Sequence, residues 1–160
     1  MRSIYCLVPV FALGLAPPLL PQQAGPDSVA WGDTIGVAGS QLTGVYATRA
    51  RGDAGCVLAM RELTGSRLHF RLDCNRGAPS YNMGVAHGIL AIAHGEATYR
   101  LTEFGGVCEL RFRFETSVVR VTQTGTDGQC GFGGNVYADG VYRLKNRRVR
   151  AADLEAAEPS

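Results

Sequence analysis

The sequence predicts an all-β protein, an eight-stranded antiparallel barrel built from two similar four-strand units. Short runs in which apolar and polar residues alternate recur along residues 44–144, and Gly, Asn and Asp fill the turns between them. The runs of the first half recur in the same order in the second half, which indicates a duplicated unit of about fifty residues. A closed barrel is favoured over a sandwich because two equal units that close on each other leave no exposed strand edge.

The N-terminal segment has the features of a secretory signal peptide. Arg2 gives a positive start, and the apolar run Ile4–Leu15 is too short to span a membrane. We therefore assign residues 1–24 to a signal peptide and residues 25–41, which are rich in Gly, Ser and Asp, to a linker. The expected product is a periplasmic or secreted protein without stable membrane insertion.

The first unit supplies four predicted strands. They cover residues 44–49, 56–62, 67–73 and 88–93. The third strand alternates cleanly, since Leu68, Phe70 and Leu72 point to one face while polar side chains point to the other. We expect each strand to have one buried face and one hydrated face.

The second unit repeats the series with four more predicted strands. They cover residues 96–102, 108–115, 117–123 and 140–144. Cys108, Leu110, Phe112 and Phe114 share one face of the second of these strands. Large apolar side chains on such faces suggest that the barrel is filled by its own residues. The first and last strands are expected to pair with each other.

The charge balance argues against a nucleic-acid-binding protein. Lys and Arg number 16 and Asp and Glu number 14. Arg2 leaves with the signal peptide, so the mature chain is nearly neutral. The one basic run, Lys145–Arg150, follows the last strand and is typical of a solvated end. The barrel domain is therefore assigned to residues 42–145 and a flexible tail to residues 146–160.

Four of the five cysteines are expected to form two disulfides. Cys6 lies in the signal peptide and leaves with it. An even set in an exported chain is typical of structural disulfides. Four cysteines allow three connectivities, and the repeat favours pairing within each unit. The favoured bridges are Cys56 to Cys74 and Cys108 to Cys130.

The sequence lacks a recognisable catalytic or metal-binding pattern. With four cysteines in bridges there is no thiol nucleophile, and no Gly-x-Ser-x-Gly turn occurs. The carboxylates of the second unit do not single out a catalytic pair. His69, His87 and His94 do not have the spacing of metal ligands. We expect neither enzymatic activity nor a metal or other cofactor.

A glycine-rich segment, residues 125–135, surrounds the last cysteine. It lacks the Gly-Lys-Ser/Thr ending of a phosphate loop, and it leads into a strand instead of a helix. Its glycines allow positive φ and close backbone approach, so Cys130 is expected to anchor a turn. The candidate binding residues are Phe132, Asn135 and Tyr137 in this loop, with Tyr81 and Asn82 at the matching positions of the first unit.

Two resemblances extend this interpretation. The segments CELRFRF and VVRVTQTGTDGQCGFGGNVYADGVYRL, within residues 108–144, resemble the C-terminal part of a group of small exported bacterial proteins of uncertain role. More loosely, the chain resembles the bacterial envelope inhibitors of c-type lysozyme, which are small, exported, disulfide-bearing eight-stranded barrels. That family's loop motif, a Ser-Gly pair followed closely by Arg-Tyr, is not matched, because the nearest stretch, Gly95–Arg100, lacks the serine.

These observations lead to two hypotheses about function. The first is an exported, non-enzymatic β-barrel that binds an exported or envelope protein through loops at one end, as an inhibitor of a cell-wall hydrolase such as lysozyme would. The alternative is a small-ligand carrier with a lipocalin-like cavity. The first predicts a filled barrel, whereas the second predicts an internal cavity.

Overall fold

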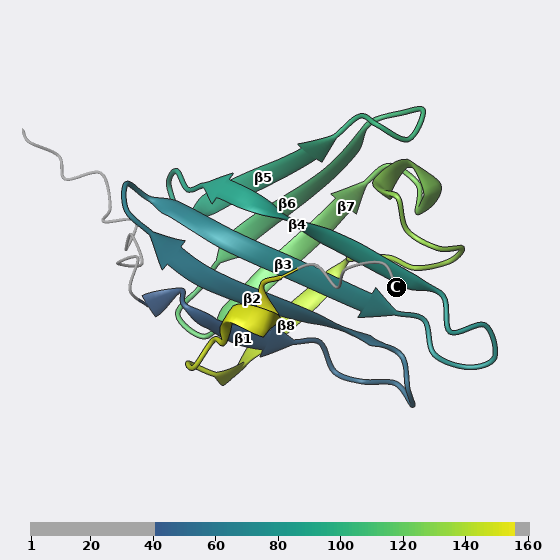
Figure 1. Cartoon of the computed structure of the whole chain (residues 1–160), viewed down its shortest axis with the longest axis horizontal. Coiled ribbons are helices and arrows are strands. Elements are labelled where there is room, and N and C mark those ends of the chain that lie inside the picture. Colours follow the sequence, from purple (N-terminus) through teal and green to yellow (C-terminus); the bar gives the residue numbers. More distant parts are fainter. Residues whose placement is uncertain (1–40, 156–160) are drawn as a thin grey trace, which may run out of the picture. The chain divides into compact units, whose positions relative to one another are not determined.

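The computed structural model describes residues 41–155. The predicted signal peptide, most of the predicted linker and residues 156–160 lie outside the described part. Eight antiparallel strands form one sheet, which curls into a nearly closed barrel and confirms the predicted all-β class (Figure 1). The strands are β1 (Gly44–Ala47), β2 (Gly55–Leu63), β3 (Arg67–Asn75), β4 (Met83–Ala91), β5 (Glu96–Leu101), β6 (Cys108–Phe114), β7 (Val118–Thr124) and β8 (Gly140–Asn146). Two single-turn 3-10 helices accompany them, η2 (Gly128–Cys130) and η3 (Ala151–Asp153).

The first and last strands join the two halves of the sheet. The strands follow the order β4-β3-β2-β1-β8-β7-β6-β5 in the sheet. β1 and β8 pair as the sequence predicts, with Tyr46 opposite Leu144 and Ala47 opposite Arg143. The seam of the barrel lies between β4 and β5, which stand at the two ends of this order.

The position of the fourth strand differs from the prediction. The sequence predicts it at residues 88–93, whereas β4 begins at Met83 and ends at Ala91. Two glycines that resemble turn residues lie inside this strand, where an aromatic ring occupies the side-chain space of Gly84 and another ring lies against Gly88. A Cβ atom on Gly84 would lie 2.5 Å from the ring of Phe132, and one on Gly88 would lie 3.4 Å from the ring of Tyr99.

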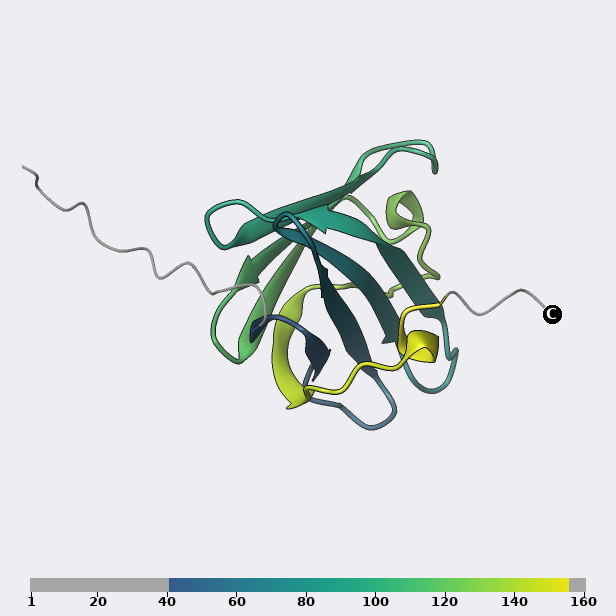
Figure 2. The same cartoon turned by 60° about the vertical axis from the view of Figure 1, so that its left-hand side comes forward.

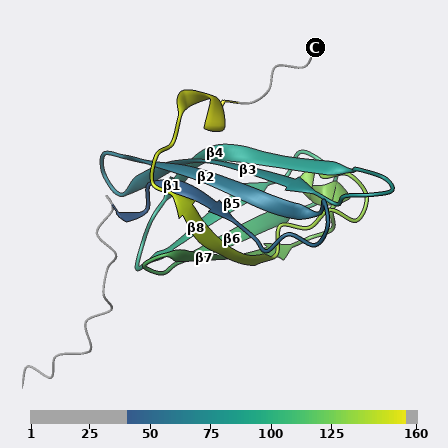
Figure 3. The ribbon, with the colours of Figure 1, turned by 90° about the horizontal axis from the view of Figure 1, so that it is seen from below.

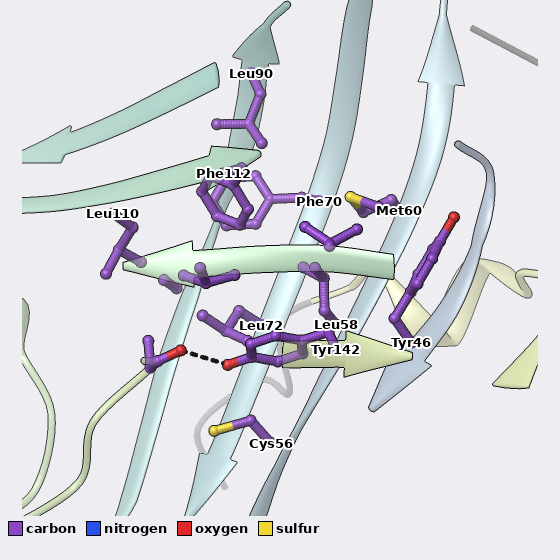
Figure 4. Packing of buried hydrophobic residues seen from close by; sticks show 14 of the residues in the cluster. Tyr46, Cys56, Leu58, Met60, Phe70, Leu72, Leu90, Leu110, Phe112 and Tyr142 are labelled. Atoms are coloured by element: carbon purple, nitrogen blue, oxygen red, sulfur yellow. Dashed lines mark hydrogen bonds between the residues drawn. The ribbon is translucent and has the colours of Figure 1, made fainter. Parts of the chain in front are cut away.

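Inward-facing side chains fill the barrel interior (Figure 4). The ring of Phe70 on β3 meets the rings of Phe112 and Tyr99 edge to face, with 5.2 Å between the ring centroids in both pairs. Leu58 and Leu72 are also fully buried. Burial of one such side chain stabilises the fold by about 2 kcal/mol. The interior is therefore a packed core that joins both sides of the barrel.

Two buried tyrosines fix the chain where it enters the first and last strands. The hydroxyl group of Tyr46 donates a hydrogen bond to the carbonyl oxygen of Leu42 at 3.1 Å. The hydroxyl group of Tyr142 donates to the carbonyl oxygen of Ala138 at 2.7 Å (Figure 4). Each bond reaches back four residues. Each tyrosine therefore buries its ring in the core and still satisfies its hydroxyl group.

The two ends of the barrel are built differently. At one end, short turns at residues 64–66, 92–95 and 115–117 join neighbouring strands; we call it the short-turn end. The other, the long-loop end, carries the loops at residues 48–54, 76–82, 102–107 and 125–139. Both disulfides lie at the long-loop end and have the favoured pairing, Cys56 to Cys74 and Cys108 to Cys130.

The C-terminal segment differs from the expected flexible tail. η3 lies outside the barrel, over the sheet (Figure 2, Figure 3). Leu154 is only 4% exposed. Nη2 of Arg61 donates to the carbonyl oxygen of Val149 at 3.0 Å, and the guanidinium group of Arg71 donates to the carbonyl group of Glu155. These contacts hold residues 147–155 against the outer face of β2 and β3. Two backbone carbonyl groups accept hydrogen bonds there, and one apolar side chain is buried.

Duplication of a four-strand unit stays a prediction. The first bridge joins two residues that face each other on β2 and β3, whereas the second joins β6 to η2. Residues 83–87, which follow Asn82, form part of β4, whereas residues 136–139, which follow the matching Asn135 of the predicted repeat, precede β8 as a loop. The two halves therefore share a strand order but not the details of their loops.

Candidate functional site

The loop at residues 125–139, which we call the stapled loop, is held in shape by its own hydrogen bonds. Asp127 is their centre. Its Oδ1 accepts from the backbone N–H of Gly128 at 2.8 Å, and its Oδ2 accepts from that of Asn135 at 2.5 Å. Its backbone carbonyl accepts from the N–H groups of Cys130 and Phe132 at 3.0 and 2.9 Å. One residue thus fixes both the start and the middle of the loop.

A glutamine closes the base of the stapled loop. Oε1 of Gln123, at the end of β7, accepts from the backbone N–H of Ala138 at 2.8 Å. The backbone N–H of Gln123 donates to Oδ1 of Asp139 at 2.9 Å. The loop therefore leaves and rejoins the sheet at fixed points.

The stapled loop is attached to the free edge of β4. The backbone N–H of Gly133 donates to the carbonyl oxygen of Met83 at 2.9 Å, as an added strand would. The ring of Phe132 fills the space above Gly84. Phe132 therefore covers the core at the point where β4 has no side chain of its own.

The same loop is also attached to the other side of the seam. Cys130 is bridged to Cys108, the first residue of β6. Phe104, in the loop between β5 and β6, lies so close to Gly131 that an added Cβ atom would be 2.6 Å from its ring. The stapled loop thus connects β4 with the segment that joins β5 to β6, across the seam that strand pairing leaves open (Figure 1).

The structure places the five predicted binding residues at the long-loop end, but not all on its surface. Phe132 is 6% exposed and faces the core. Tyr81 and Tyr137 are 55% and 51% exposed, and Asn135 is exposed as well. Asn82 is half-buried, and its Nδ2 donates to the backbone carbonyl of the stapled loop. Phe132 therefore supports the surface from inside, while the exposed residues form it.

The two predicted segments, far apart in the sequence, lie side by side. Nδ2 of Asn82 donates to the carbonyl oxygen of Gly134 at 2.7 Å. A Cβ atom on Gly133 would lie 3.0 Å from the Cβ atom of Asn82. The loop before β4 and the stapled loop therefore form one continuous surface.

A hollow of about 550 Å³, which we call the cationic hollow, lies beside the stapled loop. Its walls come from the β1–β2 loop, the facing ends of β2 and β3, and residues 135–141. Three arginines line it, Arg49, Arg51 and Arg76, against one carboxylate, Asp139. Within residues 41–155, none of these arginines has a carboxylate partner within 4 Å.

Sequence reasoning missed these three arginines. They lie in loops without a recognisable motif, and Lys and Arg (16) outnumber Asp and Glu (14) only slightly in the whole chain. The up-and-down strand order contained the missing signal, because it brings the loops at residues 48–54 and 76–82 to the same end. The shared lining of one hollow, and not a count of charge along the chain, identifies the cluster.

The hydrogen bonds and burial of this end shift two pKa values. The N–H groups of Asn135 and Gly128, in that order, lower the pKa of Asp127 because they stabilise its charged form. Burial raises the pKa of Tyr142, and the nearby charge of Asp139 raises it further. Asp127 is thus held ionised and Tyr142 neutral across the physiological pH range.

Exposed side chains and fixed backbone make up the surface chemistry of the long-loop end. In residues 41–155, no three His, Cys, Asp or Glu side chains are grouped so that they could hold a metal ion. The same part of the chain has no helix long and apolar enough to cross a membrane. What the long-loop end presents is two exposed tyrosines, backbone in a fixed conformation and three guanidinium groups.

Comparison of the chain with protein-family models, with curated proteins and with solved structures gives no match. The two resemblances noted in the sequence therefore stay predictions.

Proposed function

We propose that this protein is an exported, non-enzymatic binding module that recognises an exported or envelope protein through its long-loop end. The observation that carries the proposal is the stapled loop, whose shape is fixed by Asp127 and by the Cys130 bridge while it presents Tyr137 at the surface. A loop already fixed before binding loses less conformational entropy when a partner arrives. Exposed tyrosines are among the residues that most often dominate binding energy.

The class of partner that we propose is a cell-wall hydrolase of the lysozyme type. Glycoside hydrolases work in a cleft that contains two carboxyl groups. A rigid loop that enters such a cleft blocks the substrate without chemistry of its own. The two disulfides are compatible with an exported protein, and a periplasmic or secreted location is part of this proposal.

The alternative of a small-ligand carrier gains no support from the described residues. Tyr46, Tyr142, Phe70 and Phe112 are fully buried and occupy the interior where a ligand would lie. The cationic hollow is lined by loop residues at the end of the barrel. Within the described part, the space for a partner is thus at the surface.

The test is inhibition of a c-type lysozyme by the purified chain lacking residues 1–24. Lysis of a cell-wall suspension is followed at increasing concentrations of the protein, and binding is measured by calorimetry. The proposal expects saturable inhibition, and it expects Tyr137→Ala to weaken binding by about tenfold or more because a central tyrosine is lost.

Ile89→Ala is the matched control. Ile89 and Tyr137 are both 51% exposed, but Ile89 lies on β4 and outside the long-loop end. Its replacement is expected to leave binding unchanged. Equal weakening by both variants would contradict the use of the long-loop end, and a lysozyme that remains fully active in excess protein would contradict the inhibitor assignment.

A further inference from the structure

We infer that the cationic hollow is a carboxylate-binding site, which the partner occupies with an acidic peptide segment. This inference rests on the proposed function and adds the chemistry of the contacting surface. Three guanidinium groups and one carboxylate line the hollow, so its walls have an excess of positive charge. Such an excess, placed in a concave surface, attracts anionic groups.

The arginines of the hollow differ from the four arginines of the described part that pair with a carboxylate. Arg71, Arg111, Arg120 and Arg150 each pair with a carboxylate at 2.7 to 2.9 Å. The three arginines of the hollow have no such partner within residues 41–155, and their donors face solvent. A guanidinium group offers several N–H donors in a planar arrangement that matches a carboxylate. The guanidinium N–H donors of the hollow are therefore available to a ligand, whereas those of the four paired arginines already contact a carboxylate.

The loops that carry these arginines are held in place. The backbone N–H and carbonyl groups of Arg51 and Ala54 exchange two hydrogen bonds, at 3.0 and 3.2 Å. The backbone N–H of Arg76 donates to the carbonyl oxygen of Asn82 at 2.9 Å. A Cβ atom on Gly77 would lie 2.9 Å from the backbone nitrogen of Ala54, so the two loops are in direct contact. The backbone that positions the guanidinium groups is therefore preorganised.

The floor of the hollow is rigid as well. The bridge between Cys56 and Cys74 joins the start of β2 to the end of β3. Sγ of Cys56 lies 3.6 Å from the carbonyl oxygen of Tyr137, so the bridge supports the stapled loop. Asp139, the carboxylate of the hollow, accepts from the backbone N–H of Gln123 at 2.9 Å. One of its oxygens thus closes the loop base, and within residues 41–155 Asp139 forms no ion pair with an arginine of the hollow.

The position of the hollow links it to the proposed binding surface. Asn135 and Tyr137 belong both to the stapled loop and to the lining of the hollow. A partner that contacts Tyr137 therefore brings its own neighbouring residues over the arginines. Complementary charge at this place favours a partner with Asp or Glu side chains beside its contact with the tyrosine.

The experiment measures binding of a fluorescently labelled hexaglutamate peptide to the chain lacking residues 1–24, by anisotropy at low salt. The test variant replaces Arg49, Arg51 and Arg76 with Gln. The control variant replaces Arg111, Arg113 and Arg120 with Gln; it changes the net charge equally but on the outer face of β6 and β7. We expect the test variant to bind about tenfold more weakly and the control variant to bind as the wild type does.

Three results would overturn the inference. The first is that the hexaglutamate peptide does not bind the wild type. The second is that both triple variants bind the peptide equally more weakly. The third is that tripolyphosphate displaces the labelled peptide at a lower concentration than unlabelled hexaglutamate does. The last would assign the hollow to phosphate. Circular dichroism of both variants checks that the fold is retained. If lysozyme inhibition depends on Tyr137 while the peptide does not bind, the proposed function stands and the carboxylate site does not.

Discussion

The two ends of the barrel solve the same problem, how to join antiparallel strands, with different means. The short-turn end uses connections of a few residues and has no disulfide among the described residues. The long-loop end carries both disulfides and the four longer connections. Short turns are fixed by the strands that they join, whereas long loops need further bonds to keep one conformation. Covalent bridges thus stand where the fold alone would leave the backbone free, and where recognition residues are usually found.

The largest expected effect comes from removing the bridge of the stapled loop. Cys108→Ser combined with Cys130→Ser opens a link between residues separated by 22 positions and should lower the free energy of unfolding by about 3 kcal/mol. Urea denaturation measures this loss. Hydrogen exchange should accelerate in residues 125–139 and not in the turns at 64–66 and 115–117. Acceleration at both ends would break the comparison.

Filling the gap on β4 should also loosen the long-loop end. In Gly84→Val, the new side chain meets the ring of Phe132, since even a Cβ atom would lie 2.5 Å from it. We expect a loss of about 2 kcal/mol from overpacking, measured by thermal denaturation. Gly128→Ala is the control, because no heavy atom lies within 4 Å of its added Cβ atom. A stable Gly84→Val protein would show that Phe132 is free to leave its place.

The two tyrosines allow the ends to be compared with one kind of change. Tyr142→Phe removes the bond to Ala138 at the long-loop end, and Tyr46→Phe removes the bond to Leu42 at the other. Each should cost about 1 kcal/mol at neutral pH. Burial raises the pKa of both tyrosines, so their stabilising effect is complete below the ordinary pKa of about 10 and is lost as the pH rises toward the folded-state value.

As the pH rises from about 9 to about 12, a range that includes the ordinary tyrosine pKa of about 10, both variants should therefore lose less stability than the wild type. Denaturant titrations at several pH values measure this difference. The difference should be larger for Tyr142, whose pKa is raised by Asp139 in addition to burial, whereas Arg147 opposes the shift of Tyr46. Identical alkaline profiles of all three proteins would refute this account.

The smallest expected effect is the acid sensitivity of the stapled loop. The pKa of Asp127 is lowered in the folded state, so its contribution is present above the ordinary pKa of about 3.9 and is lost as the pH falls through the folded-state value. Asp127→Asn has no such charge to lose. Its melting temperature should therefore fall less than that of the wild type on acidification from about pH 5 to about pH 2. Parallel curves would show that the carboxylate has no special role.

Alternation along the strands was sufficient to predict the fold. The pattern around Phe112 identifies an inward face because alternation is a local signal. The even cysteine set predicts two bridges, and the similarity of the two halves favoured the pairing that the structure has. The burial of Phe132 depends on Gly84, a residue 48 positions away, and neither residue reveals the other in the sequence. Leu154 follows the last strand and belongs to no alternating pattern, so its packing was equally hidden. The candidate site was thus located by its loops, but its arginines and its inner support required the three-dimensional arrangement.

Pairing of β1 with β8 has a consequence for folding during synthesis. The first strand to leave the ribosome needs the last one as its second neighbour. Contacts between such distant parts of a chain form late, because a long loop must be closed to make them. Until β8 has been synthesised, the strands β4-β3-β2-β1 and β7-β6-β5 have no strand to join them into one sheet, and a product that ends before Gly140 cannot complete the cylinder.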